Sequence, residues 1–284
     1  MTEKLFTKNF TLLVLGQVTS LFGNFILKLA LSMYVLEATG SAAIFAGILS
    51  AATIPTILLS PLGGILADRA DRRNMMVALD TLTGVSVLCG ALFLSEGNAV
   101  AAISALLIIL SVLGAFETPA VQACIPTMLQ GDNIMKGNAV VNQAASLSFL
   151  IGPVLGGVLY AMLGLKPIMY ASVVCFFITA LFECFIKLNY ERTQNKGGIL
   201  RIVKQDLLLS MQFISKEQTS ISKMLLLTAF SRFFVMGITV VGLPFLVRTV
   251  LGFNARYYGA AESALAVATI LGSLAAAVLA EKLH

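Results

Sequence analysis

Long apolar runs, separated by short polar segments, fill most of the chain. Eight of them reach the length of roughly 20 residues that a helix needs to cross the apolar part of a bilayer. They lie at about 10–36, 42–67, 74–94, 99–125, 138–163, 167–188, 223–247 and 258–281. Backbone groups inside a bilayer must be paired within the protein, so each run is predicted to be a helix. The pattern therefore predicts an all-α polytopic membrane protein.

One connection between the runs is long, at residues 189–222. Its first part is polar, and the stretch from Ile199 to Lys216 is amphipathic, which predicts a helix lying at the membrane surface. We therefore predict three parts: a bundle of six helices at 1–188, a cytoplasmic linker at 189–222, and two further helices at 223–284.

The segment between the second and third runs combines glycines with charged residues. It matches the G-x-x-x-D-R-x-x-R-R signature found at this place in major facilitator transporters, through Gly64, Asp68, Arg69, Arg72 and Arg73. We expect the small residues to let two helices approach closely and Asp68 to cap the start of a helix. The arginines would hold the loop on the cytoplasmic side. A plain basic loop that only sets topology is the alternative.

The fifth run contains a second motif. Gly152-Pro153-Val154-Leu155-Gly156-Gly157 resembles the G-P-x-x-G-G signature of drug and proton antiporters in the same superfamily, although Ser148 replaces the usual preceding glycine. Pro153 is expected to bend the helix, and the glycines to give it a close-packing face. The ordinary enrichment of glycine and proline in membrane helices is the alternative.

Further segments narrow the resemblance to macrolide-efflux and enterobactin-exporter-like facilitators. These segments are Leu15–Gln17, Leu21–Asn24, Asp80, Ala115–Ala120 and Leu243–Val247. The resemblance implies a major facilitator fold, with a six-helix N-terminal bundle followed by the first two helices of the C-terminal bundle. It also implies proton-coupled efflux of drugs, macrolides, siderophores or similar amphipathic small molecules by alternating access. A metabolite or lipid carrier, or an inactive or partner-dependent membrane fragment, stays open.

The last two runs echo the first two. A shift of 213 positions places Ser60, Leu66, Ala67, Asp68 and Arg69 on Ser273, Leu279, Ala280, Glu281 and Lys282. Transporters of this kind are built from two repeated six-helix halves. We therefore expect the complete protein to continue with about four more helices. A natural eight-helix protein is the alternative.

Charged residues inside apolar runs are expensive and mark candidate functional sites. Lys28 is expected either to bind an anionic group or an acid across a cavity, or to extend its amine to the membrane interface. For Asp80, a gating pair with Arg72 or Arg73 is favoured over proton carriage.

Glu117 is the preferred candidate for protonation, with an interfacial position as the alternative. Arg232 is expected to face the cavity or to pair with Glu117 or Glu183. Glu183 and Glu262 are expected to be solvated, because they lie near the ends of their runs. Gln17 and Asn24 complete the candidate proton and substrate site. Relatives often have aspartate at the position of Asn24, and an amide cannot carry a proton.

Composition removes most other function classes. Apolar residues make up 58% of the chain and charged residues 12%, far from the balance of a soluble domain. The net charge of +5 does not indicate nucleic acid, because the basic residues lie in loops at membrane edges. The cysteines have no metal-binding spacing, and the single histidine is His284, the last residue. We therefore expect no enzyme, metal or cofactor, and partners limited to a small molecule, protons and the bilayer; the oligomeric state stays open.

The distribution of lysine and arginine predicts the orientation. With the N-terminus inside, only Lys166, Arg248 and Arg256 fall outside, whereas fourteen basic residues become cytoplasmic: Lys4, Lys8, Arg69, Arg72, Arg73, Lys136, Lys187, Arg192, Lys196, Arg201, Lys204, Lys216, Lys223 and Lys282. Short loops rich in these residues stay in the cytoplasm. We predict a multi-pass protein of the cytoplasmic membrane with a cytoplasmic N-terminus.

Overall fold

The computed structural model describes residues 5–95, 97–188, 212 and 219–283. Its elements are α1 (Lys8–Thr39), α2 (Ala42–Arg69), α3 (Arg72–Phe93), α4 (Ala99–Met128), α5 (Asp132–Leu163), α6 (Leu165–Cys184), α8 (Thr219–Met236), η2 (Gly237–Gly242), α9 (Leu243–Phe245), η3 (Leu246–Val250) and α10 (Ala255–Leu283). The segments η2 and η3 are π-helical, so α8 to η3 form one continuous helical segment.

Seven helical segments of the described chain are long and apolar enough to cross a membrane: α1 to α6 and residues Ser220–Val250. Helix α10 covers the eighth predicted run. The predicted all-α polytopic membrane fold is therefore confirmed. The helices extend beyond the apolar runs because polar residues cap them; for example, the side chain of Thr7 accepts a hydrogen bond from the N–H of Phe10 at the start of α1. Helix α6 ends at Cys184, four residues before the predicted end of its run.

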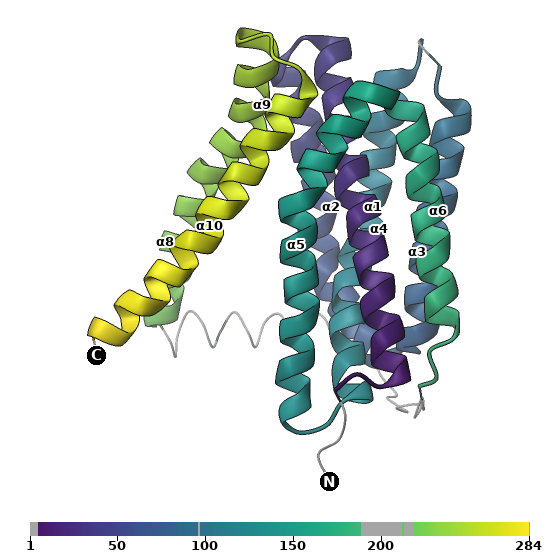
Figure 1. The fold of residues 1–284 in the computed structure, drawn as a ribbon, viewed down its shortest axis with the longest axis vertical. Coiled ribbons are helices and arrows are strands. Elements are labelled where there is room, and N and C mark those ends of the chain that lie inside the picture. Colours follow the sequence, from purple (N-terminus) through teal and green to yellow (C-terminus); the bar gives the residue numbers. More distant parts are fainter. Residues whose placement is uncertain (1–4, 96, 189–211, 213–218, 284) are drawn as a thin grey trace.

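Helix α1 lies among α4, α5 and α6 in the bundle formed by α1 to α6 (Figure 1). Glycine lets α6 approach α1 closely: a Cβ on Gly23 would lie 3.0 Å from Cβ of Cys175 on α6. Hydroxyl groups on α6 bind the backbone of α1 at the same places, since Ser172 donates to the carbonyl of Gly23 at 3.2 Å and Thr179 to that of Gly16 at 3.1 Å. Small residues and hydroxyls thus join two membrane helices without an apolar driving force.

The bundle contains two buried apolar clusters at different heights. One cluster includes Phe10, Met76 and Ile125 near the N-terminal end of α1. The other includes Leu27 and Phe176 nearer the opposite end. Between the two clusters lie polar side chains from four helices: Gln17, Ser20, Asp80, Thr83, Glu117, Thr179 and Glu183. The interior is therefore divided by a polar layer.

Helices α8 and α10 lean away from the bundle at one end and approach it at the other (Figure 1). Helix α10 packs on α5 through small residues: Gly259 faces the carbonyl oxygen of Pro153, and Ser263 donates a 2.7 Å hydrogen bond to the carbonyl of Leu150. The side chains of α8 from Ser220 onward are mostly exposed, which leaves this apolar helix to contact lipid.

The predicted surface helix at 199–216 lies outside the described residues, apart from Gln212. The division into parts at 1–188, 189–222 and 223–284 stays a prediction. The continuation of the repeat beyond the second pair of helices also stays a prediction. The residues that echo α2, from Ser273 to Lys282, lie in helix α10.

Candidate functional site

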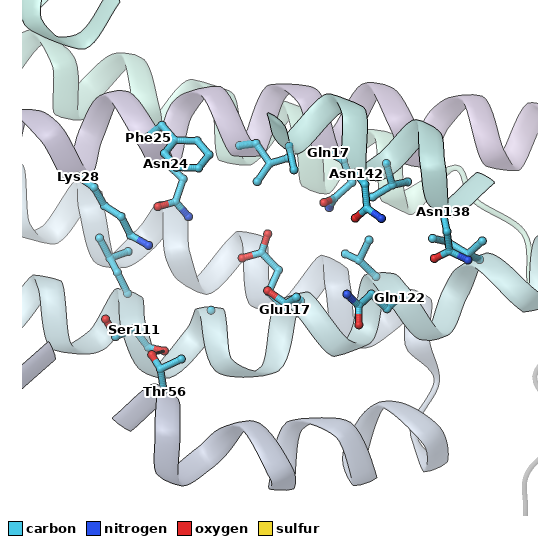
Figure 2. A pocket seen from close by; sticks show the side chains of 18 residues that line it. Gln17, Asn24, Phe25, Lys28, Thr56, Ser111, Glu117, Gln122, Asn138 and Asn142 are labelled. Atoms are coloured by element: carbon cyan, nitrogen blue, oxygen red, sulfur yellow. Dashed lines mark hydrogen bonds between the residues drawn. The ribbon is translucent and has the colours of Figure 1, made fainter. Parts of the chain in front are cut away.

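A cavity of about 370 Å³ lies between four helices of the bundle (Figure 2). Helix α1 lines it with Gln17, Asn24 and Lys28, and α4 contributes Glu117. The remaining polar lining side chains come from α2, α4 and α5: Thr56, Ser111, Thr118, Gln122, Asn138 and Asn142. The cavity therefore brings together four residues that the sequence nominated for a proton or substrate site.

Two opposite charges face this cavity. Figure 2 shows the ammonium of Lys28 and the carboxyl of Glu117 both directed into the space, from different helices. They do not form an ion pair within 4 Å. A charge at membrane depth needs a partner or water. Lys28 is exposed because it faces the open cavity. Of the two interpretations of Lys28, the structure favours the cavity over the membrane interface.

Amide groups supply most of the remaining polarity. Gln17, Asn24 and Lys28 follow each other at spacings of seven and four residues, so they share one face of α1. Nε2 of Gln17 and Oδ1 of Asn24 are buried and lack a hydrogen-bond partner within the described protein. Buried polar atoms are normally satisfied, so these two are available to a ligand or to water. Asn138 and Asn142, one helical turn apart on α5, were missed in the sequence, although this spacing on an apolar helix was a usable signal.

Asp80 is fully buried beside the cavity wall, and its neighbours differ from the prediction. The hydroxyl of Ser20 lies 3.1 Å from Oδ1 of Asp80 and 3.3 Å from Oε1 of Glu117. Among the described residues, Asp80 forms no ion pair with Arg72 or Arg73, unlike the prediction; both arginines bind backbone carbonyls instead. The prediction that Glu183 is solvated is wrong: its side chain is 1% exposed and lies against Asp80.

The two arginines of the loop hold the ends of helices. Nε of Arg72 donates to the carbonyl of Ala67 at 3.1 Å, in the last turn of α2. Nε of Arg73 donates to the carbonyl of Glu183 at 3.4 Å, and its terminal amine to that of Cys184, at the end of α6. Cations at helix C-termini satisfy unpaired carbonyls and stabilise the helix dipole. The arginines therefore join α2, α3 and α6 at one end of the bundle.

The helix start in this loop is capped one turn later than predicted. Asp68 lies in the last turns of α2 and is exposed, whereas Asp71 is the N-cap of α3 and accepts a 3.3 Å hydrogen bond from the N–H of Asn74. Likewise, α2 and α4 approach each other closely at Gly63. A Cβ on Gly63 would collide with the carbonyl of Ala115 on α4. Gly64 has open space there, and Arg69 lies in the last turn of α2.

Replacing Asp71 by alanine will destabilise the start of α3. Loss of an N-cap aspartate costs about 0.5–2 kcal/mol. Asp68→Ala is the matched control: a negative charge near a helix C-terminus is unfavourable, so its removal will leave stability unchanged or slightly raised. The midpoint of thermal unfolding of the purified protein measures both. Equal midpoints for the two variants would contradict the assignment of Asp71 as the cap.

The glycines of the motif in α5 face two different helices. A Cβ on Gly152 would lie 2.8 Å from Cβ of Phe25 on α1, and one on Gly156 would lie 3.0 Å from Cδ2 of Leu29. A Cβ on Gly157 would instead lie 2.5 Å from the carbonyl oxygen of Ala255 on α10. The motif thus lets α5 pack closely between α1 and α10, with Pro153 inside the helix.

Arg232 does not reach the site. It is exposed on α8 and does not line the cavity, unlike the prediction that it would face the cavity or pair with Glu117 or Glu183. Its helix, α8, leans away from the bundle (Figure 1).

A second charged contact closes the opposite end of the bundle. Glu37, near the end of α1, forms an ion pair with Arg248 of η3 and accepts a 2.7 Å hydrogen bond from the hydroxyl of Tyr160 on α5. Arg248 also donates to the carbonyl of Phe253 at 2.8 Å. This contact, which the sequence did not reveal, joins η3 to α1 and α5 at this end of the bundle.

Comparison with known proteins places this arrangement in a family. The sequence profile of the Major Facilitator Superfamily matches residues 13–284. Macrolide efflux protein A of Streptococcus pyogenes is 28% identical over 175 residues, which cover 61% of this chain and 43% of that protein. Multidrug efflux pump Tap of Mycolicibacterium fortuitum is 25% identical over 209 residues, 72% of this chain and 51% of that protein.

The putative bacilysin exporter BacE of Bacillus subtilis is 27% identical over 188 residues, 65% of this chain and 46% of that protein. The chain spans about half the length of the curated relatives it matches. The superfamily profile, by contrast, covers nearly the whole chain, from the first membrane helix to the last residue. Together with the bundle of apolar helices, this match shows that the chain belongs to the Major Facilitator Superfamily.

Proposed function

We propose that the protein is a secondary transporter that exports amphipathic small molecules from the cytoplasm in exchange for protons. The observation that carries this proposal is the polar cavity inside a membrane-spanning bundle, with Glu117 and Lys28 facing it. A titratable carboxyl inside a membrane is a candidate proton carrier by default. The cavity also has apolar lining residues such as Leu21, Phe25 and Val141, which suit an amphipathic ligand.

The relatives support the substrate class. Their names describe macrolide efflux, multidrug efflux and bacilysin export. We therefore assign drugs and macrolides as the first compounds to test. The same proposal places the protein in the cytoplasmic membrane with a cytoplasmic N-terminus, because Lys8, Arg72 and Arg73 lie at the end of the bundle where α1 begins.

Coupling between proton binding and binding of the exported compound would arise from the balance of charges in the cavity. Ionised Glu117 balances the charge of Lys28 across the space. A proton on Glu117 removes that balance, so the affinity for a bound compound changes with protonation. Rocking of one group of helices against the other would then expose the cavity to either side. The contact of Glu37 with Arg248 would close one side, and the loop of Asp68 to Arg73 would close the other.

Accumulation of a macrolide in bacteria tests the proposal directly. Cells of a macrolide-sensitive strain that make this protein are expected to accumulate less radiolabelled erythromycin than cells without it. A protonophore is expected to remove the difference, because the export is driven by the proton gradient. Equal accumulation with and without the protein, for macrolides and for a panel of amphipathic dyes, would refute export of this class.

Asp68→Asn is expected to lower export while leaving membrane insertion intact. The carboxylate of Asp68 is exposed at the end of α2. It is therefore positioned to interact with another part of the transporter when the helices rock. Erythromycin accumulation and the amount of protein in the membrane fraction measure the two effects. Normal efflux in this variant would exclude a gating role.

A further inference from the structure

Three acidic side chains lie close together at the edge of the cavity. Glu117 faces the cavity, while Asp80 on α3 and Glu183 on α6 are 0% and 1% exposed. Ser20 of α1 stands between Asp80 and Glu117. We propose that Ser20, Asp80 and Glu183 form a proton relay that carries protons between Glu117 and the end of α6, separately from the substrate cavity. The direction of proton movement rests on the proposed function, whereas the existence of the relay does not.

The first link follows from the number of protons on Ser20. Its hydroxyl lies within hydrogen-bond distance of two carboxyl oxygens, at 3.1 Å from Asp80 and 3.3 Å from Glu117. A hydroxyl has one proton to donate and two lone pairs that accept. If Ser20 donates to one carboxyl, the other must donate to Ser20, and only a protonated carboxyl can do so. The geometry therefore requires a proton on Asp80 or on Glu117 for both contacts to be hydrogen bonds.

The second link joins Asp80 to Glu183. Both side chains are buried, on helices α3 and α6 that pack side by side, and their carboxyl groups face each other. Oδ2 of Asp80 and Oε2 of Glu183 are buried and have no hydrogen-bond donor within the described residues. Two carboxylates only accept hydrogen bonds, so a proton on either one supplies the missing donor. The chain from Glu117 through Ser20 and Asp80 to Glu183 is then continuous.

The charges around this layer make three ionised carboxylates untenable. Lys28 is on the cavity side, and it influences Glu117 without forming an ion pair. Arg73 approaches Glu183 but binds its backbone carbonyl. The thiols of Cys124 and Cys184 also lie near Glu183, and Lys8, Asp71, Arg72 and Lys187 lie further out at this end of the bundle. Buried charges without direct partners are strongly unfavourable, so the layer must retain protons.

The relay has a separate opening at its far end. Glu183 is in the last turn of α6, next to a pocket of about 470 Å³ lined by Lys8, Asp71, Arg73 and residues Cys184–Leu188. That pocket shares no lining residue with the cavity. One proton would pass from Glu117 to Oγ of Ser20 while Ser20 gives its own proton to Asp80. Asp80 would then protonate Glu183, which releases a proton to water in the pocket. A proton could thus leave while a ligand fills the cavity.

Infrared spectroscopy of the purified protein in lipid tests the relay without any substrate. At neutral pH the wild type is expected to show the C=O stretching band of protonated carboxyl groups. Asp80→Asn and Glu183→Gln are each expected to reduce the intensity of this band. Glu117→Gln is expected to shift the frequency of the remaining band, because residue 117 acts on Asp80 through the hydroxyl of Ser20. In Ser20→Ala this shift is expected to vanish, whereas Ser20→Thr keeps the hydroxyl and restores it.

Ser104→Ala is the matched control, because the hydroxyl of Ser104 binds only the carbonyl of Val100 in its own helix. It is expected to leave the band and the shift as in the wild type. Absence of a protonated band at neutral pH, or a Glu117→Gln shift that persists in Ser20→Ala, would overturn the relay. Since these readouts need no transport, they remain decisive even if the protein exports no macrolide.

Proteoliposomes then test proton movement, with erythromycin as the probe and a pH-sensitive dye as the detector. A positioned proton-transfer group typically accelerates transfer by about 10²- to 10⁴-fold. Ser20→Ala is therefore expected to slow erythromycin-coupled proton flux by about 10²-fold or more, with erythromycin binding unchanged. Ser20→Thr is expected to retain most of the flux. Full flux in Ser20→Ala would reject Ser20 as a link, while absence of flux in the wild type would count against the proposed export alone.

Discussion

Replacing Glu117 by glutamine is expected to make the binding of a macrolide independent of pH. Glutamine keeps the size of the side chain but cannot take up a proton. Coupling between two ligands of one protein is typically about 5- to 150-fold in affinity. We therefore expect the affinity of the wild type for erythromycin to change by a factor in this range when Glu117 is protonated. The variant should show one affinity at all pH values and no export against a gradient.

The position of Glu117 explains why this effect should be large. Its carboxyl faces the cavity across from Lys28, so its charge acts directly on any bound compound. It also contacts Ser20 and, through it, the buried Asp80. Glutamine therefore removes the site of protonation, while its amide can still hydrogen-bond Ser20.

Equilibrium binding of labelled erythromycin across a range of pH measures this directly. Glu262→Gln is the control, because Glu262 on α10 accepts a 2.8 Å hydrogen bond from Tyr258 and does not line the cavity. This control should keep the pH dependence of the wild type. If Glu117→Gln also kept it, another group would have to be the proton carrier, and the proposed role of Glu117 would be discarded.

The apolar runs predicted the helices well, because lipid leaves the backbone few alternatives. That Lys28, Asn24 and Gln17 share one face of α1 could also be predicted from the sequence, since helical spacing follows from residue number. Contacts between different helices could not be predicted from the sequence in this way. Which helix lies beside Ser20 depends on packing that a single sequence does not encode in its periodicity.

Two errors illustrate this limit. Glu183 lies near the end of an apolar run, a place that predicts solvation, but α1 and α3 pack on α6 and cover it in the bundle. Arg73 was expected to pair with Asp80, seven residues along the same helix. It turns instead to the end of α6, where free carbonyls accept its guanidinium. Both outcomes depend on α6 packing beside α3, a tertiary contact.

The glycines of the loop motif show the same limit at the scale of one residue. Gly63 and Gly64 are adjacent, yet they point to different sides of α2 because successive residues of a helix are rotated around its axis. Only Gly63 faces α4, where the carbonyl of Ala115 occupies the space that a side chain would need. A signature match cannot indicate which of two neighbouring glycines makes the contact.

Gly63→Ala and Gly64→Ala are therefore expected to change stability in opposite directions. Overpacking at a close contact costs typically about 1–3 kcal/mol. Gly63→Ala forces α2 away from the backbone of Ala115, which cannot yield as a flexible side chain would. Gly64 lies in a helix with nothing within 4 Å of the added methyl group. Alanine is favoured over glycine inside a helix by about 0.5–1 kcal/mol, so this variant should be slightly more stable.

The midpoint of thermal unfolding in lipid or detergent measures both variants under one set of conditions. Gly63→Ala should unfold at a lower temperature than the wild type and Gly64→Ala at the same or a higher one. Because both changes add one methyl group to the same turn of the same helix, hydrophobicity and helix propensity cancel in the comparison. The two variants differ only in whether the added methyl group faces the backbone of α4. Equal midpoints, or a lower one for Gly64→Ala, would mean that the helices meet through another face of α2 than the one that carries Gly63.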